Sequence, residues 1–215
     1  VETLRGYTHT AISDHNEAAS WAAAALATKG DITVGGATQQ ELMTFLNVYR
    51  KVGGEFEVLE DGIRFWHPGT PLKPVMIETD VHPGFMTDWQ QPLIVALTQA
   101  EGESVVHETV YENRFGFTEA LNEMGAHIVV HQSGLASITR RVPRRPLEQA
   151  AVITGPTPLH GASVRVPDLR GGFSHLIAGL AATGTSTISN VGIISRGYEL
   201  FIDKLTALGA DFELV

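Results

Sequence analysis

The chain has 215 residues, of which 15 are Lys or Arg, 24 are Asp or Glu, and none is Cys. A net charge of -9 argues against a nucleic-acid-binding protein, because phosphate contacts need a concentrated basic surface. The lack of cysteine excludes disulfides, thiolate metal sites and a thiol nucleophile or acid supplied by this sequence.

The length suffices for one sizeable hydrophobic core, so we expect a single domain over residues 1–215. No apolar stretch reaches the roughly 20 residues of a membrane span, and no basic stretch followed by an apolar run opens the chain. We therefore expect a cytoplasmic protein with no membrane partner. Because the opening at Val1 reads like the middle of a protein, we also expect this chain to be a fragment of a longer one, with processing or tag removal as the alternative.

One pattern occurs three times: an apolar helix, a strand led by a glycine, an amphipathic helix, and a second glycine followed by another strand. Self-similarity of this kind predicts one supersecondary unit per copy. We place the units at about residues 9–70, 71–145 and 150–215. The paired glycines are 24, 23 and 25 residues apart: Gly30 and Gly54, Gly102 and Gly125, Gly184 and Gly209.

The two kinds of helix differ in their apolar pattern. Residues 18–28 and 173–182 are apolar around most of their circumference, which predicts helices enclosed inside the molecule. Two other segments carry apolar residues at i, i+3, i+4 and i+7, which predicts helices with one buried face on the surface. Those residues are Leu42, Phe45, Leu46 and Tyr49 in the first unit, and Tyr198, Phe201, Ile202 and Leu205 in the third.

Turn and capping residues mark the boundaries of several elements. Thr38 to Glu41 matches a capping box, and Gly53, Gly125 and Gly209 stand where a helix end favours a left-handed residue. Residues 55–58 alternate with period two, and Asp61-Gly62 then turns the chain into residues 63–66, which predicts a hairpin.

Helices and strands alternate along the whole chain, so the fold class is α/β or α+β. A parallel dinucleotide-binding sheet is disfavoured, because no G-x-G-x-x-G follows a strand and the hairpin implies antiparallel or mixed sheets.

Asp88 follows Thr87 at the start of the enclosed helix of the second unit, after a Pro-Gly loop. A carboxylate at a helix N-terminus is favoured by the helix dipole and can accept a proton or a hydrogen bond. The alternative is plain helix capping by one of these two residues. Pro92 marks the first turn of this helix or bends it.

Three arginines are expected beside helix N-termini. Arg114 lies within residues 110–115, Arg196 within residues 195–199, and Arg170 follows Asp168 ahead of two glycines. A guanidinium beside unpaired helix N–H groups suits a phosphate or carboxylate ligand. The alternative is an Arg–Glu pair that braces each loop.

Neither the histidines nor the basic loop predicts a further site. His127 and His131 lie on an expected strand, where four residues span roughly 13 Å, too far for one metal ion. We predict no metal site. Residues 137–148 hold four arginines without helical or strand periodicity, which favours a solvated surface loop over a contact with phosphate or another chain.

Four motifs in chain order resemble those of the UDP-N-acetylglucosamine 1-carboxyvinyltransferase family of enolpyruvyl transferases. The resemblance covers nearly all of the chain but only about half of such an enzyme. It implies an inside-out α/β barrel of three βαβαββ units with helices inside, here the C-terminal barrel of two. The motifs are PGFMTDWQ (83–90), ETVYENRF (108–115), PDLRGG (167–172) and RGYELFIDKLTALGA (196–210).

The resemblance also implies a reaction and a role for each site residue. The enolpyruvyl group of phosphoenolpyruvate passes to the 3-hydroxyl of UDP-N-acetylglucosamine through a tetrahedral intermediate, with release of phosphate, at the start of peptidoglycan precursor synthesis. No cofactor is implied. Asp88 would accept the hydroxyl proton, Arg196 would bind phosphoenolpyruvate, and Arg170 and Arg114 would hold charge and geometry. Val110, Asp168 and Thr87 would lie against the nucleotide sugar.

The missing N-terminal barrel would supply a mobile loop with a Cys or Asp general acid, together with Lys and Arg residues of the phosphoenolpyruvate pocket. This chain alone would then be inactive. It also departs from the family pattern at Met86, Ser195 and His15, which bears on substrate preference. Two alternatives stay open: a transferase domain for shikimate 3-phosphate, and a non-catalytic module that binds a nucleotide sugar or a protein.

Overall fold

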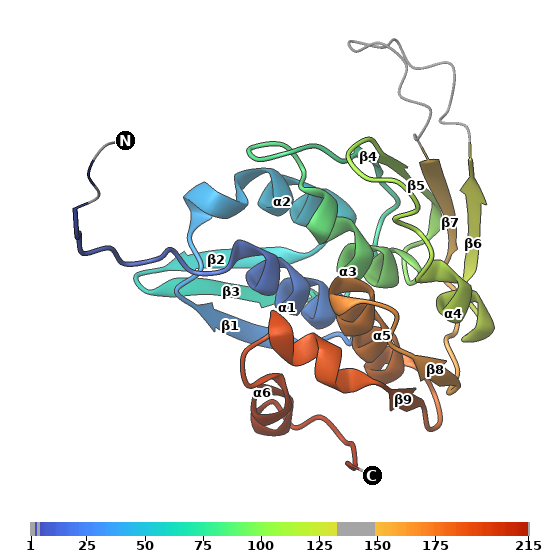
Figure 1. Ribbon diagram of the computed structural model, residues 1–215. Coiled ribbons are helices and arrows are strands. Elements are labelled where there is room, and N and C mark those ends of the chain that lie inside the picture. The colour runs from blue at the N-terminus through green and yellow to red at the C-terminus, as the bar shows by residue number, and fades with distance from the viewer. Residues whose placement is uncertain (1–2, 4, 133–148, 215) are drawn as a thin grey trace.

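Three apolar helices form the centre of the computed structural model, which describes residue 3 and residues 5–132 and 149–214 (Figure 1). They are α1 (His15–Ala27), α3 (Thr87–Leu97) and α5 (Leu169–Ala181), and each pair of them is in contact. Each central helix also contacts a sheet of its own unit, and the sheets stand around the helices. This confirms the predicted α/β class with helices inside.

The three small sheets each contain part of one common strand order, which is complete only in the second sheet. Beside α1 the order is β1-β3-β2, beside α3 it is β4-β5-β7-β6, and beside α5 only β8-β9 is formed. The pairs β4–β5 and β8–β9 are parallel and the others are antiparallel, as the predicted hairpin and mixed sheets require. The bounds are β1 (Asp31–Gly35), β2 (Glu55–Leu59), β3 (Gly62–Trp66), β4 (Met76–Glu78), β5 (Gly102–Glu108), β6 (His127–His131), β7 (Gln149–Gly155), β8 (Ser163–Arg165) and β9 (Thr187–Ser189).

Strands β1, β5 and β9 hold equivalent places, and the second sheet is the fullest version of the pattern. In the described chain, β1 lacks the parallel neighbour that β4 gives to β5, and β9 lacks the antiparallel neighbour that β7 gives to β5. Strand β7 completes the second sheet, so the predicted unit boundary between residues 145 and 150 was wrong and moves past residue 155. The single-barrel organisation of residues 1–215 stays a prediction.

The last strand predicted for the third unit is not formed. Residues 210–214 follow Gly209 (φ 80°) without strand structure. The equivalent strand of the second unit, β6, pairs only with β7, and the described part of the chain offers residues 210–214 no such partner. A strand with no ladder to join gains no backbone hydrogen bonds, which explains the difference.

The outer helices are α2 (Gln39–Val52), α4 (Thr118–Glu123) and α6 (Phe201–Ala207). Helix α2 buries its predicted apolar face and ends at Gly53, whose φ of 110° confirms the left-handed cap. The predicted capping box was wrong, because the exposed Thr38 side chain makes no cap hydrogen bond. Helix α6 begins at Phe201 rather than Tyr198, since a 3-10 helix, η1 (Val191–Arg196), and a left-handed Leu200 (φ 49°) precede it.

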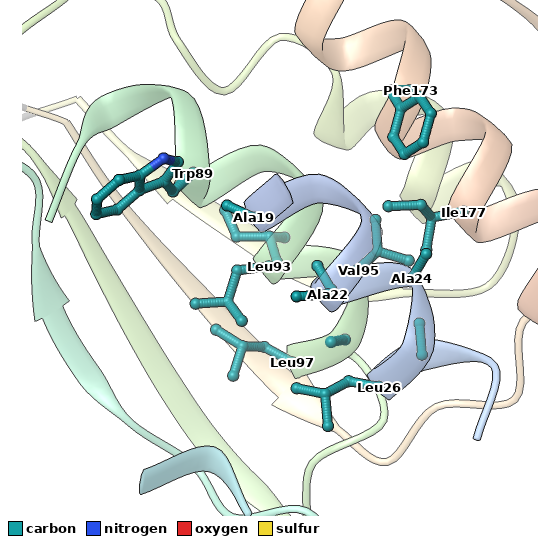
Figure 2. Packing of buried hydrophobic residues seen from close by; sticks show 14 of the residues in the cluster. Ala19, Ala22, Ala24, Leu26, Trp89, Leu93, Val95, Leu97, Phe173 and Ile177 are labelled. Carbon is teal, nitrogen blue, oxygen red and sulfur yellow. The ribbon is translucent and has the colours of Figure 1, made fainter. Parts of the chain in front are cut away.

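Alanines on α1 let the central helices approach closely. Ala19 and Ala22 are fully buried, and Figure 2 shows them beside Leu93 and Leu97 of α3, which are also fully buried. Pro92 is the sixth of the eleven residues of α3 and not in its first turn, so the helix lacks the N–H that would bond to the carbonyl of Asp88. None of the described helices combines the length and hydropathy of a membrane span.

Enlarging a central alanine should destabilise the fold. We expect Ala22→Leu to lower the free energy of unfolding by about 1–3 kcal/mol, because its neighbours leave no room for three more carbons. Urea unfolding followed by tryptophan fluorescence measures the change. Ala207→Leu, at an exposed position of α6, is the matched control and should leave stability nearly unchanged. Equal stability of the two variants would contradict close packing of the helices.

Candidate active site

Asp88 lies between two arginines from different elements. Its Oδ1 accepts a short hydrogen bond from Nη2 of Arg114, and its Oδ2 lies 3.3 Å from Nε of Arg170. The side chains are partly buried, with exposed fractions of 26% for Asp88, 21% for Arg114 and 13% for Arg170. The structure thus brings together three predicted site residues from positions 88, 114 and 170.

Arg170 is held in place on several sides. Asp168 caps α5, with its Oδ1 accepting from the backbone N–H of Arg170 at 2.9 Å, and the guanidinium lies 5.4 Å from the centre of the Tyr198 ring. Burial opposes the charge of Arg170, but Tyr198, Asp88 and Asp14 outweigh it and raise the pKa of the guanidinium. Asp14 caps α1, Asp88 lies in the first turn of α3 and Asp168 caps α5, so charged groups at the starts of all three central helices lie around Arg170.

Tyr198 connects this site to α1. Its ring stacks on Phe173 at 4.1 Å, and its hydroxyl lies 2.9 Å from Oγ of Ser20. Ser20 donates its own proton to the carbonyl of Asn16 at 2.8 Å, so the Tyr198 hydroxyl is the donor to Ser20. Tyr198 therefore supports the Arg170 guanidinium from a position that packs against two central helices.

Arg114 lies in a turn, which corrects the prediction that it sits at a helix N-terminus. Helix α4 begins only at Thr118, because residues 110–117 turn through Asn113 with a φ of 50°. The Arg114 carbonyl accepts from Nε2 of Gln91 at 3.1 Å, and the guanidinium lies 5.3 Å from the Tyr111 ring centre. Its ion-pair partner is Asp88 and not a glutamate of its own loop, so the alternative of a local Arg–Glu brace was wrong.

Buried His175 on α5 also holds this turn. Its Nε2 lies 3.1 Å from the carbonyl oxygen of Phe117, three residues after Arg114, and burial lowers the pKa of the imidazole. A neutral imidazole that donates to a carbonyl ties α5 to the turn, which stabilises the approach of Arg114 to Asp88.

The other predicted site residues lie around this group. Arg196 ends η1 with an exposed side chain, and within the described chain it makes no hydrogen bond or ion pair with Asp88, Arg114 or Arg170. Thr87 is buried and donates to Glu108 at 2.8 Å, so neither Thr87 nor Asp88 serves as the helix cap. Val110 is half-buried in the turn that leads to Arg114.

Two residues of the site were not predicted individually, although both lie in the quoted motifs. They are Glu108, the first residue of ETVYENRF, and Tyr198 of RGYE. Glu108 could have been predicted from its position, because it is a carboxylate at the end of an apolar strand. The predicted apolar face had placed Tyr198 on a surface helix.

The site offers both a proton acceptor and unused donors. Two of about four lone-pair positions of the Asp88 carboxylate are occupied, which leaves room for a hydroxyl. Buried Nε of Arg114 and Nη1 of Arg170 have no hydrogen-bond partner in the described chain, and such donors suit an anionic ligand.

No group of three or more potential metal ligands occurs among the described residues. Residues 137–148 lie outside the described chain.

A cleft lies near the start of α1 and does not contain the charged residues of the site. It has a volume of about 930 Å³ and runs along β1 between the starts of α1 and α2 and the end of α6. Its walls include Asp14 and His15 but none of Asp88, Arg114 and Arg170. The cleft follows the edge of β1 that lacks a parallel neighbour in the described chain, so it lies where the first sheet is incomplete.

Comparison with known proteins gives concordant matches. The family profile of EPSP synthase (3-phosphoshikimate 1-carboxyvinyltransferase) matches residues 1–205. Proteins named UDP-N-acetylglucosamine 1-carboxyvinyltransferase are similar over 96% of the chain, at 52% identity in Protochlamydia amoebophila and 46% in Chlamydia abortus. The chain spans 44% and 47% of these relatives, about half of their length.

Solved structures give the same picture of the fold. The enolpyruvyl transferase NikO from Streptomyces tendae matches with a TM-score of 0.79 and 27% identity, over 93% of this chain and 44% of that one. An EPSP synthase from Acinetobacter baumannii matches with a TM-score of 0.67, over 93% of this chain and 46% of that one. Its identity of 17% carries information about the fold alone.

Removing the Tyr198 hydroxyl should lower the stability of the fold and reduce the loss of stability at alkaline pH. We expect Tyr198→Phe to lower the free energy of unfolding by about 1 kcal/mol at neutral pH, because Ser20 loses a buried donor. Burial raises the pKa of Tyr198 above 10.0, so the unfolded chain releases this proton first and stability falls as the pH rises past 10.0.

Urea unfolding at neutral pH and at about pH 10.5 measures both effects. The loss between the two pH values should be smaller in Tyr198→Phe than in the unmodified chain. Tyr7→Phe, at a side chain that is 84% exposed, is the control. An unchanged pH response in Tyr198→Phe would show that its hydroxyl is not the buried group described.

Proposed function

The chain belongs to the EPSP synthase (3-phosphoshikimate 1-carboxyvinyltransferase) family, and from this premise we propose that it is the C-terminal half of a UDP-N-acetylglucosamine enolpyruvyl transferase. The full-length protein transfers the enolpyruvyl group of phosphoenolpyruvate to the 3-hydroxyl of UDP-N-acetylglucosamine. The names and identities of its relatives support this acceptor. The product serves peptidoglycan synthesis in the cytoplasm, and residues 1–215 form one barrel of the enzyme.

The placement of Asp88 between Arg114 and Arg170 is the observation that carries this proposal. Transfer needs a base that takes the proton of the acceptor hydroxyl while cations stabilise the negative charge of the second substrate. The Asp88 carboxylate has lone pairs for the first task, and the two guanidinium groups beside it serve the second. Because all three lie where the central helices begin, the positive ends of the helix dipoles add to the attraction for anions.

The remaining residues take roles by position around this centre. Arg196 binds phosphoenolpyruvate, and its exposure leaves the guanidinium accessible to an anion. Val110 contacts the nucleotide sugar at the turn that leads to Arg114. Asp168 lies close to the sugar while it caps α5, and Thr87 supports the sugar site from the first turn of α3.

The family resemblance implies that the general acid belongs to the other half of the protein, and this chain contains no cysteine. The tetrahedral intermediate then forms between the two barrels, and phosphate leaves as the enolpyruvyl ether forms. We expect the 215-residue chain alone to release no phosphate from the two substrates, and addition of the N-terminal half to restore release.

Loss of the Asp88 carboxylate should abolish most of the activity of the full-length protein. We expect Asp88→Asn to lower kcat by about 10²–10⁴-fold, because an amide cannot accept the hydroxyl proton. Phosphate release with saturating substrates measures the rate. Asp203→Asn, at an exposed position of α6, is the matched control and should retain full activity. Equal rates for the two variants would show that Asp88 is not the general base.

The acceptor separates this proposal from its alternatives. We expect the full-length protein to release phosphate with UDP-N-acetylglucosamine at least about 100-fold faster than with shikimate 3-phosphate, since a site built for one polar ligand rejects another strongly. Phosphate assays with each acceptor provide the comparison. A preference for shikimate 3-phosphate would favour the other transferase, and binding without turnover would favour a non-catalytic module.

A further inference from the structure

Glu108 is a fully buried carboxylate that none of the predicted site roles uses. It is the last residue of β5, its side chain has no exposed surface, and it makes no ion pair within the described chain. Burying a carboxylate is costly unless its lone pairs are satisfied. A carboxyl group at such a position calls for a reason specific to the site.

Within the described chain, the hydrogen bonds to the Glu108 carboxylate come from donors in two segments of the site. Its Oε2 accepts from Oγ1 of Thr87 at 2.8 Å and, through a short hydrogen bond, from Nε2 of Gln90. Its Oε1 accepts from the backbone N–H groups of Val110 at 2.7 Å and Tyr111 at 2.9 Å. One carboxylate therefore joins the first turn of α3 to the turn that leads to Arg114.

With the donors as they stand, the two oxygens of Glu108 accept on both sides at once. A glutamine at this position would present one oxygen and one NH2 group, so its NH2 would face Thr87 and Gln90, which would have to rotate the hydroxyl and flip the amide to accept. The backbone N–H groups of Val110 and Tyr111 cannot reverse their role. Hydrogen bonds to an ionised acceptor are also shorter and stronger than neutral ones, which suits a rigid connection.

The two joined segments carry the two ends of the Asp88–Arg114 pair. Asp88 directly follows Thr87, and Arg114 lies three residues after Tyr111. Two further hydrogen bonds hold the residue after Glu108. The Thr109 hydroxyl donates to the carbonyl of Thr79 at 2.6 Å, and the Thr109 backbone N–H donates to the Thr79 hydroxyl at 3.0 Å. The turn after β5 is thus held from both neighbouring elements.

We propose that Glu108 is a positioning residue, which fixes the Asp88 carboxylate relative to Val110 and Arg114 so that the acceptor hydroxyl meets its base. This role rests on the proposed transferase function. Glu108 itself touches no substrate and acts through the two segments that it joins. Misplacement of a reacting group by about 1 Å can cost about 100-fold in rate, so a positioning contact has a measurable effect on turnover.

The test uses the full-length enzyme and compares Glu108→Gln with Glu103→Gln, an exposed carboxylate on the same strand. We expect Glu108→Gln to lower kcat about tenfold and to raise the KM for the nucleotide sugar, with the KM for phosphoenolpyruvate unchanged. The control should match the unmodified enzyme. A residue needed only for folding would lower the amount of active enzyme without changing either KM.

A charge swap keeps the test decisive if single variants fold poorly. Gln90→Glu alone places two carboxylates together, so we expect it to lose activity, as Glu108→Gln does. The double variant Gln90→Glu/Glu108→Gln restores one ionised acceptor opposite one amide donor and should recover most of kcat. A double variant no more active than Glu108→Gln would overturn the proposal.

Coupling to Asp88 gives an independent readout. If Glu108 acts through Asp88, Glu108→Gln should change kcat less than about twofold in an Asp88→Asn background, because coupled residues are not additive. If Glu108→Gln lowered kcat as much in the Asp88→Asn background as in the unmodified enzyme, the proposal would be overturned.

Failure of the transferase function itself would appear differently, as no phosphate release by the unmodified full-length protein. In that case a crystal structure of Glu108→Ala still decides. A broken Asp88–Arg114 contact supports the positioning role, and an intact contact overturns it.

Discussion

The close packing of α1, α3 and α5 is the constraint on which the rest of the structure depends. Their apolar surfaces exclude water on nearly all sides, so the sheets must stand outside them and the polar ends must gather at the ends of the bundle. Asp88 at the start of α3 meets Arg170 at the start of α5 and Arg114 from the turn after β5. The site is thus a consequence of the inside-out arrangement.

The chemistry at this end depends on a small network of charged and hydrogen-bonded groups. Asp88 pairs with Arg114 and Arg170, and each of these arginines is supported by a side chain from another element. Tyr198 supports Arg170, and Glu108 connects the turn before Arg114 to the start of α3. A partly buried ion pair gains from such support, since its geometry no longer depends on flexible side chains alone.

Three charged residues of the motifs, Asp88, Arg114 and Arg170, lie together in the structure, whereas the predicted starts of two helices were wrong. Asp88 was expected at the start of α3 and lies there, since a buried helix preceded by a Pro-Gly loop leaves few places for its N-terminus. Arg114 and Arg196 were expected at helix starts, yet they precede α4 and α6 by several residues. Left-handed Asn113 and Leu200 delay these helices, and periodicity of apolar residues does not reveal such backbone conformations.

The amino-acid sequence by itself determined the alternation of buried and surface helices, the glycine-marked boundaries and the identity of the charged residues. These features are local, because each depends on side-chain size, polarity and spacing within one segment. Only the tertiary structure decided that β7 belongs to the second sheet, that Arg114 pairs with Asp88, and that Glu108 accepts from two segments at once. Those outcomes depend on contacts between residues far apart in the chain, whose geometry is set when the three central helices pack together.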